Sequence, residues 1–301
     1  MPEPLHWFVA SVKGLTPERA RDSEALARIL RELANAMELL PNSQRPTSGE
    51  IRAAAAELAK SEDEAARRAA LDRALTAALG ALVVRTPPEG KEAEYHAAVD
   101  DFAAAVQGLG EEVGTARASL IRAAFRAAAD VVLLAAGGVA PFEEDRTGLP
   151  ASELGSLDAE LDQARGDVIL LARARSSRAP QTGARALRAL ADVIAVADKG
   201  RENTTQIASV RFQAERLKFS DPLTFGRAQW LKAGLTAALD ALDGLKCVPA
   251  SAERPSEPAR RAVDSIADKG SISFQRAPIQ DGFRATLAAF ERALRGAAAC
   301  R

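Results

Sequence analysis

Cysteine, histidine and aromatic side chains are scarce in this chain, and the scarcity excludes several classes of site. The 301 residues include two cysteines and two histidines, too few for a typical zinc site built from Cys and His ligands. Aromatic residues make up 4% of the chain, which disfavours nucleic-acid binding through stacked bases. The sequence therefore predicts no cofactor, and nucleic acid is not an expected partner.

Long hydrophobic runs are missing as well. The longest apolar stretch, Val131–Ala140, falls far short of the roughly 20 residues that span a bilayer as a helix. The apolar segment Leu5–Ala10 is too short for the core of a signal peptide, and no basic segment precedes it. We expect a protein without a transmembrane segment that works in the cytoplasm. An extracytoplasmic protein is the alternative if a leader peptide has been removed.

Alanine-rich segments are abundant instead, and similar segments occur twice. Three segments of the first half recur in the second half in the same order, with a shift of roughly 158 residues. The matched pairs are Ala27–Asn35 with Ala184–Asp192, Leu75–Leu79 with Leu235–Leu239, and Phe125–Ala127 with Phe283–Ala285. Because the order is kept at a nearly constant spacing, we infer an ancient tandem duplication.

Apolar residues at helical spacing indicate the fold class. The clearest stripe lies in residues 23–40 and comprises Leu26, Ile29, Leu30, Leu33 and Met37. Alanine has the highest helix propensity and a poor strand propensity. We therefore predict an all-α protein made of two tandem, internally duplicated antiparallel helical bundles of about five helices each. The first bundle is expected in residues 1–150 and the second in residues 151–301.

Start and stop signals fit this interpretation. Two capping boxes are expected to open helices at Thr47 and Ser61, and Ser156 is expected to cap a later helix. The glycine pair that begins at Gly137 is expected to end one.

The two halves differ in charge and in bulk. Residues 1–150 hold 17 Lys and Arg against 23 Asp and Glu, and the remainder holds 23 against 18. An acidic and a basic bundle can dock together or recruit unlike partners, and drift after duplication is the alternative.

The two halves also differ in the size of aligned side chains, because the repeat aligns Ala53 with Phe212 and Ala70 with Trp230. We expect aromatics at the centre of the second bundle, and either closer helices or a groove in the first.

Arginines without neighbouring acids mark the start of the second half. Residues 168–191 contain no Asp or Glu but hold Arg173, Arg175, Arg178, Arg185 and Arg188. One interpretation is positive charge that stabilises a helix C-terminus. The other is an anion-binding patch for phosphates, nucleic acid or a membrane surface. Because no aromatics are interleaved, the first interpretation is favoured.

Two Asp-x-x-x-Asp spacings are the strongest hint of an enzyme. They consist of Asp158 with Asp162 and of Asp264 with Asp268. Two such motifs on facing helices are how all-helical prenyl-transferring enzymes hold magnesium and a diphosphate, and hard cations prefer carboxylate oxygens. Those enzymes line their pocket with aromatics, which are scarce here. In a chain with 41 acidic residues such spacing arises often by chance, which is the favoured interpretation, and a metal site between the two copies is the alternative.

The two cysteines, Cys247 and Cys300, each follow the C-terminal end of an expected helix. The two helices are expected to run in the same direction, so both residues are placed at one end of a bundle. A disulfide is one expectation, and two thiols, as in the cytosol, is the other.

No catalytic or ligand motif stands out, so the sequence does not identify an activity. The leading hypothesis is a non-catalytic helical scaffold or adaptor that binds a protein partner or itself. A second hypothesis is an all-helical enzyme or small-molecule binder that uses the Asp-x-x-x-Asp pairs. A third is a protein that binds anions or a membrane surface through the stretch from Arg173 to Arg188.

Overall fold

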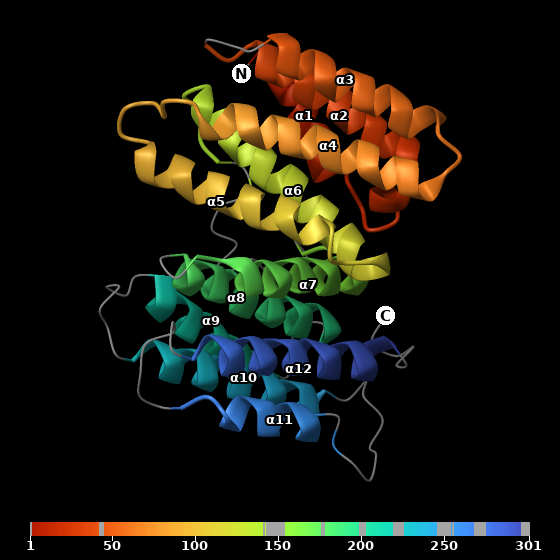
Figure 1. Cartoon of the computed structure of the whole chain (residues 1–301). Coiled ribbons are helices and arrows are strands. Elements are labelled where there is room, and N and C mark those ends of the chain that lie inside the picture. Colours follow the sequence, from red (N-terminus) through yellow and green to blue (C-terminus); the bar gives the residue numbers. More distant parts are fainter. Residues whose placement is uncertain are drawn as a thin grey trace. The chain divides into compact units, whose positions relative to one another are not determined.

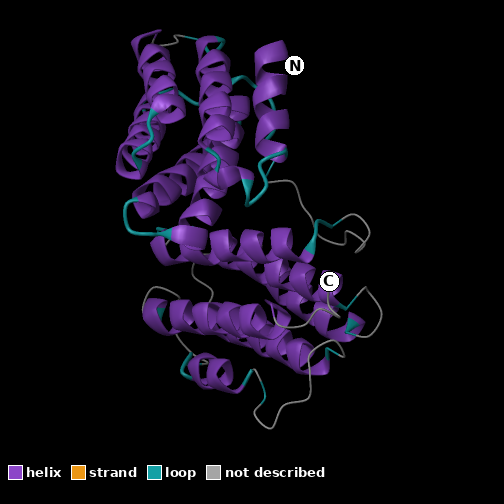
Figure 2. Cartoon of the chain, turned by 90° about the vertical axis from the view of Figure 1, so that its right-hand side faces the viewer, coloured by secondary structure: helices purple, strands orange, loops and turns teal. Residues whose placement is uncertain are grey.

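The protein is helical throughout the part of the chain that the structure describes. The computed structural model describes residues 2–41, 45–140, 142, 154–175, 178–198, 203–218, 226–245, 254, 256–267 and 275–295. Within these ranges it contains twelve α-helices, one 3-10 turn and no strand (Figure 1 and Figure 2). The predicted all-α class is therefore confirmed. The chain divides into two compact units, Met1–Asp145 and Arg146–Arg301, here named the first and the second unit.

Antiparallel helical hairpins build the first unit. Its elements are α1 (Glu3–Lys13), η1 (Arg19–Arg21), α2 (Ser23–Glu38), α3 (Arg45–Lys60), α4 (Glu64–Val83), α5 (Glu92–Leu109) and α6 (Gly114–Ala135). Each of these α-helices packs against the next one, and α6 also contacts α1 and α4. The last helix therefore closes the unit against the first.

Short polar caps set where these helices begin and end. The Asp22 carboxylate accepts a hydrogen bond from the backbone N–H of Glu24 at 2.9 Å and starts α2. Asp63 caps α4 in the same way. At the other end of a helix, Gly137 has a φ of +78° and follows α6, as the sequence predicts. Such a φ strains any residue with a Cβ, which is why a glycine ends this helix.

Leucine, alanine and a few aromatic rings fill the core of the first unit. Phe102, Phe125 and Tyr95 are among its largest fully buried side chains. The Tyr95 hydroxyl donates a hydrogen bond to the carbonyl of Leu82 at 2.6 Å, which ties α5 to the end of α4. Burial raises the pKa of the Tyr95 phenol, because the charged phenolate is disfavoured away from water.

Each unit has six α-helices among its described residues, one more than the sequence analysis expects. The additional helix of the first unit is α1. It buries Leu5, Phe8, Val9 and Val12, an apolar stripe at helical spacing. This short helix is stabilised by packing, because isolated helices of its length are marginal in water.

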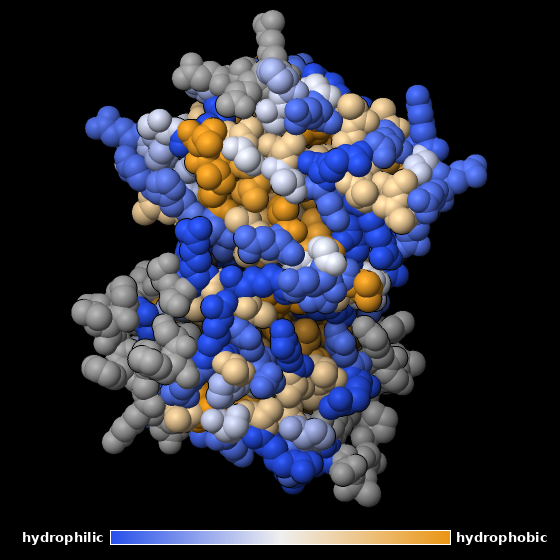
Figure 3. Space-filling view, in the orientation of Figure 1, coloured by the Kyte–Doolittle hydropathy of each residue, from blue (hydrophilic) through white to orange (hydrophobic). Residues whose placement is uncertain are grey.

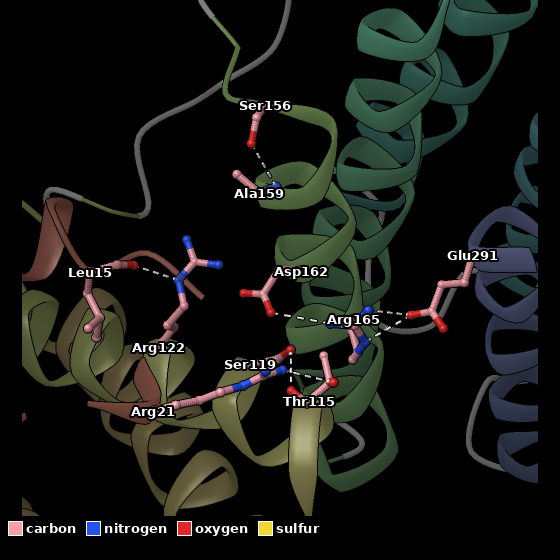
Figure 4. A network of polar contacts seen from close by, with 10 residues as sticks. All are labelled: Leu15, Arg21, Thr115, Ser119, Arg122, Ser156, Ala159, Asp162, Arg165 and Glu291. Carbon is pink, nitrogen blue, oxygen red and sulfur yellow. Dashed lines mark hydrogen bonds and ion pairs between the residues drawn. The ribbon is translucent and has the colours of Figure 1, made fainter. Parts of the chain in front are cut away.

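The second unit repeats the same order of hairpins. Its helices are α7 (Leu157–Arg173), α8 (Ala179–Ala197), α9 (Thr204–Lys218), α10 (Arg227–Gly244), α11 (Glu257–Asp264) and α12 (Arg276–Arg295). Its last helix, α12, contacts α7 and α10, as α6 contacts α1 and α4. The hydroxyl of Ser156 accepts a hydrogen bond from the N–H of Ala159 at 3.3 Å and caps α7 as predicted (Figure 4).

Both segments of the longest internal match, those that begin at Ala27 and Ala184, lie in helices, α2 and α8. The fifth helices differ most, because α5 has 18 residues and α11 has eight. The tandem duplication itself stays a prediction.

Phe283 and Phe290 are fully buried in the core of the second unit, but the two aromatic residues that the alignment places at its centre, Phe212 and Trp230, are not. Phe212 has 59% of its surface exposed, and Trp230 is half-buried. The guanidinium of Arg216 lies 5.7 Å from the ring centroid of Phe212 and 4.5 Å from that of Trp230. For Phe212 the prediction was wrong because the aligned position is exposed in the first unit as well, at Ala53. Trp230, whose counterpart Ala70 is buried, packs partly against the core.

Candidate anion-binding site

A pocket of about 430 Å³ opens in the first unit, where three helices begin. The starts of α2, α4 and α6 meet there beside η1 and the end of α3. Its apolar lining includes Leu26, Leu58, Leu71 and Ile121, all of which are buried. Its polar lining consists of Arg21, Ser23, Glu64, Arg67, Arg68, Thr115 and Arg117. Four guanidinium groups therefore share the pocket with one lining carboxylate.

The positions of these arginines run against helix electrostatics. Arg21 precedes the capping residue of α2, Arg67 and Arg68 lie near the start of α4, and Arg117 lies near the start of α6. The positive end of the helix dipole lies at the N-terminus, so a cation there is disfavoured by some tenths of a kcal/mol up to about 1 kcal/mol. Residues that break a local rule in this way often mark a functional site.

Two of the four arginines are paired with carboxylates. Arg117 has only 8% of its side chain exposed, and its Nη2 lies 2.8 Å from Oδ1 of Asp72. Its Nη1 donates to the carbonyl of Leu109. Arg68 forms an exposed ion pair with Glu64, at 2.5 Å between Nη2 and Oε1. These two charges are locally balanced.

Arg21 and Arg67 donate to hydroxyl groups instead. Nη2 of Arg21 donates to Oγ1 of Thr115 at 3.0 Å (Figure 4). Nη1 of Arg67 donates to Oγ of Ser23 at 3.3 Å. Glu18, whose pKa is lowered mainly by a backbone hydrogen bond, also feels the charge of Arg21, but neither guanidinium is held in an ion pair by a carboxylate of the described residues.

The five arginines that the sequence analysis singles out lie in the second unit. Arg173 donates from Nη1 to the carbonyl of Ile169, 3.5 Å away in the last turn of α7, as the helix-end interpretation requires. Arg185 faces Asp167, with 3.9 Å between Nε and Oδ1. Arg188 faces Glu215 of α9, with 3.7 Å between Nε and Oε1.

The remaining two arginines of that group lie between these helices. Arg175 is exposed and Arg178 directly precedes α8. Residues 168–191 contain no acid, but the carboxylates that face Arg185 and Arg188 lie outside this window. Asp167 directly precedes it, and Glu215 belongs to another helix.

The aspartates of the proposed metal site are spread over different environments. Asp158 and Asp264 are exposed, whereas Asp162 has 3% of its side chain exposed and pairs with Arg165 at 3.2 Å. Arg165 also bonds to Glu291 of α12, at 2.6 Å (Figure 4). Across the described ranges, no three His, Cys, Asp or Glu side chains gather as metal ligands.

Three residues named in the sequence analysis, Asp268, Cys247 and Cys300, lie outside the described residues. The disulfide therefore stays a prediction.

The arginine pocket was not predicted from the sequence, although the internal match contains a signal for it. At the spacing that relates Ala27 to Ala184, Arg21 corresponds to Arg178, which also precedes a helix. At the spacing that relates Leu75 to Leu235, Arg67 corresponds to Arg227, the first residue of α10. An arginine pair at two helix starts thus occurs in both halves.

Comparison with known proteins adds no relative to this description. No protein-family model matches the chain, and neither a curated protein nor a solved structure matches it. Of the helices described, none is long and apolar enough to cross a membrane.

Proposed function

We propose that this chain is a non-catalytic helical binding protein whose first unit takes up an anionic ligand in the arginine pocket. The observation that carries the proposal is the pair Arg21 and Arg67, whose guanidinium groups line the pocket and bond to hydroxyls rather than to carboxylates. Guanidinium groups bind carboxylates and phosphates through paired hydrogen bonds. An anion in the pocket would balance both charges.

Binding rather than catalysis is favoured by the kind of groups in the pocket. Arginine keeps its proton at every physiological pH. It therefore binds an anion but does not act as a general acid or base. The lining carboxylate, Glu64, is held by Arg68. The pocket also has the mixed character of small-molecule sites, with an apolar floor and a few polar groups that orient the ligand.

Replacing both Arg21 and Arg67 with glutamine is expected to weaken anion binding at least tenfold. Hydrogen bonds to charged groups contribute about 1.5–3 kcal/mol each, and 1.4 kcal/mol is tenfold in affinity. Isothermal titration calorimetry with phosphate, sulfate and citrate at low salt measures the effect. The matched control is R31Q, because Arg31 is an exposed arginine of α2 that does not line the pocket. Equal affinity in the wild type and the double variant would refute the proposal.

The fold of the double variant should be intact. Glutamine keeps a side-chain N–H donor for Thr115 and Ser23, and loss of a positive charge near a helix start is not expected to destabilise the helix. We expect a melting temperature equal to or slightly above that of the wild type. Loss of binding would then report on the pocket and not on unfolding.

A second candidate function, docking of a protein partner or a second copy, has its own observation. Leu39, Val83 and Val84 have 46%, 50% and 70% of their surface exposed. They lie at the ends of α2 and α4. Just beyond these ends, Nη1 of Arg85 donates a hydrogen bond of 2.5 Å to the carbonyl of Pro41. Figure 3 shows apolar residues gathered where α4 leads towards α5. Exposed apolar clusters often mark interaction surfaces.

If this surface joins two copies, substituting Leu39 and Val84 with asparagine should convert a dimer into a monomer. Burial of apolar surface contributes about 25 cal/mol per Å², and each substitution removes much of that gain. Light scattering during size-exclusion chromatography measures the mass. A wild type that is monomeric at high concentration would exclude self-association through this surface.

A further inference from the structure

We infer that the anion taken up by the arginine pocket is the dianionic group of a small organic phosphomonoester. The inference rests on the proposed function and names the ligand class. It is drawn from the charge balance, the donors and the lining of the pocket.

The charge balance favours a dianion over a monoanion. Arg68 pairs with Glu64 and Arg117 with Asp72, so two of the four guanidinium charges are compensated. Arg21 and Arg67 bring two further positive charges to the pocket that no ion pair of the described residues holds, although Glu18 interacts with Arg21 at longer range. A monocarboxylate or a sulfate ester balances one of them, whereas a phosphomonoester above its second pKa of about 6 balances both.

The donors suit the three terminal oxygens of a phosphoryl group. The guanidinium groups of Arg21 and Arg67 each have several N–H groups in a planar fork, of which one bonds to a hydroxyl of the pocket. Ser23 and Thr115 each accept a hydrogen bond from an arginine and keep their own hydroxyl proton for donation. Together these groups supply donors from four elements, η1, α2, α4 and α6, which is more than a single carboxylate can use.

The start of α6 is an additional donor at the same pocket. Its preceding residue, Val113, makes no side-chain cap, in contrast to the capping carboxylates that start α2 and α4. Gly114 lines the pocket with a φ of +56°, and a Cβ placed there would meet nothing within 4 Å. Uncapped N–H groups at a helix start favour a phosphate. Here they support a site already defined by four arginines.

The apolar lining indicates that the phosphate belongs to a small organic molecule. Leu26, Leu71 and Ile121 line the pocket. A volume of about 430 Å³ lies in the range of small-molecule sites, and a bare phosphate ion would leave most of it empty. An apolar ester group would cover the lining and exclude water from the ion pairs.

Calorimetry with three probes tests the inference at pH 7.5 and pH 5. The probes are phenyl phosphate, phenyl sulfate and inorganic phosphate. Phenyl sulfate has nearly the same shape as phenyl phosphate but carries one charge at every pH used. We expect phenyl phosphate to bind at least tenfold more tightly than phenyl sulfate at pH 7.5. At pH 5 the phosphate takes up a proton, so the difference should shrink to about twofold or less. We also expect phenyl phosphate to bind more tightly than inorganic phosphate.

The outcomes separate this inference from the proposed function. Equal binding of phenyl phosphate and phenyl sulfate that depends on Arg21 and Arg67 would leave an anion site but overturn the phosphomonoester. Equal binding of phenyl and inorganic phosphate would overturn the organic part of the inference. If no probe binds, or if the R21Q/R67Q variant binds as the wild type does, the proposed function fails as well.

Substitution of Glu64 is expected to strengthen ligand binding, whereas substitution of Arg21 and Arg67 weakens it. Its carboxylate competes with the ligand for Arg68, so E64Q should bind phenyl phosphate two- to fivefold more tightly. The matched control is E62Q, because Glu62 is exposed nearby and does not line the pocket. Weaker binding by E64Q would contradict competition between Glu64 and the ligand.

Discussion

Replacing Phe125 with alanine is expected to lower the free energy of unfolding of the first unit by about 3–5 kcal/mol, the usual range for a buried phenylalanine. The side chain has no exposed surface and lies in α6, which contacts α1, α4 and α5. Its removal would leave a cavity that the surrounding helices cannot fill without shifting. Denaturant unfolding measures the change, and hydrogen exchange should show the loss of protection within Met1–Asp145.

Phe283 provides the matching experiment in the second unit. The repeat aligns it with Phe125, and it is equally buried, in α12. F283A should therefore cost a similar amount, with the loss of protection within Arg146–Arg301. F212A is the control, because Phe212 is 59% exposed and should cost about 1 kcal/mol or less. A loss below 1 kcal/mol for F125A would mean that α6 does not organise the first core.

Replacing Arg165 with alanine is expected to destabilise the second unit by about 3–5 kcal/mol, because it leaves a buried carboxylate with a lost partner. Arg165 is 11% exposed and joins Asp162 of α7 to Glu291 of α12. The first and last helices of the unit are thus linked by one side chain. Thermal unfolding measures the effect.

The exposed pair between Arg73 and Glu57 is the control for Arg165. Its side chains are 58% and 45% exposed, so R73A should cost no more than about 1 kcal/mol. If R165A and R73A had equally small effects, the Arg165 pairs would be a minor contribution to the fold.

Much of the fold could be predicted from local signals. The apolar stripe of α2 and the stop at Gly137 depend on neighbouring residues only, and the structure confirms them. The expected capping boxes were less accurate. The helix expected to start at Thr47 begins earlier, at Arg45, and the cap of α4 is Asp63 rather than Ser61. A serine or threonine near a helix start competes with neighbouring polar residues, and packing decides which one caps.

The pocket could not be predicted, because it depends on three helix starts that meet in space. Arg21, Arg67 and Arg117 are far apart in the sequence, so their convergence leaves no local pattern of charge. The stretch from Arg173 to Arg188 looked more basic because its partners lie elsewhere in the chain. Local charge in the sequence therefore pointed to a stretch in which Arg185 and Arg188 face carboxylates from outside the acid-free window of residues 168–191, and did not point to Arg21 and Arg67.

The arginines at the starts of α4 and α6 also bear on how this protein would respond to engineering. Helix-start cations are among the first residues that a search for heat-resistant variants replaces, since their removal improves the match to the helix dipole. Selection by melting temperature alone would thus favour the loss of Arg67, and with it the loss of the proposed anion binding. A stabilised version made to test that proposal should therefore keep Arg67 unchanged.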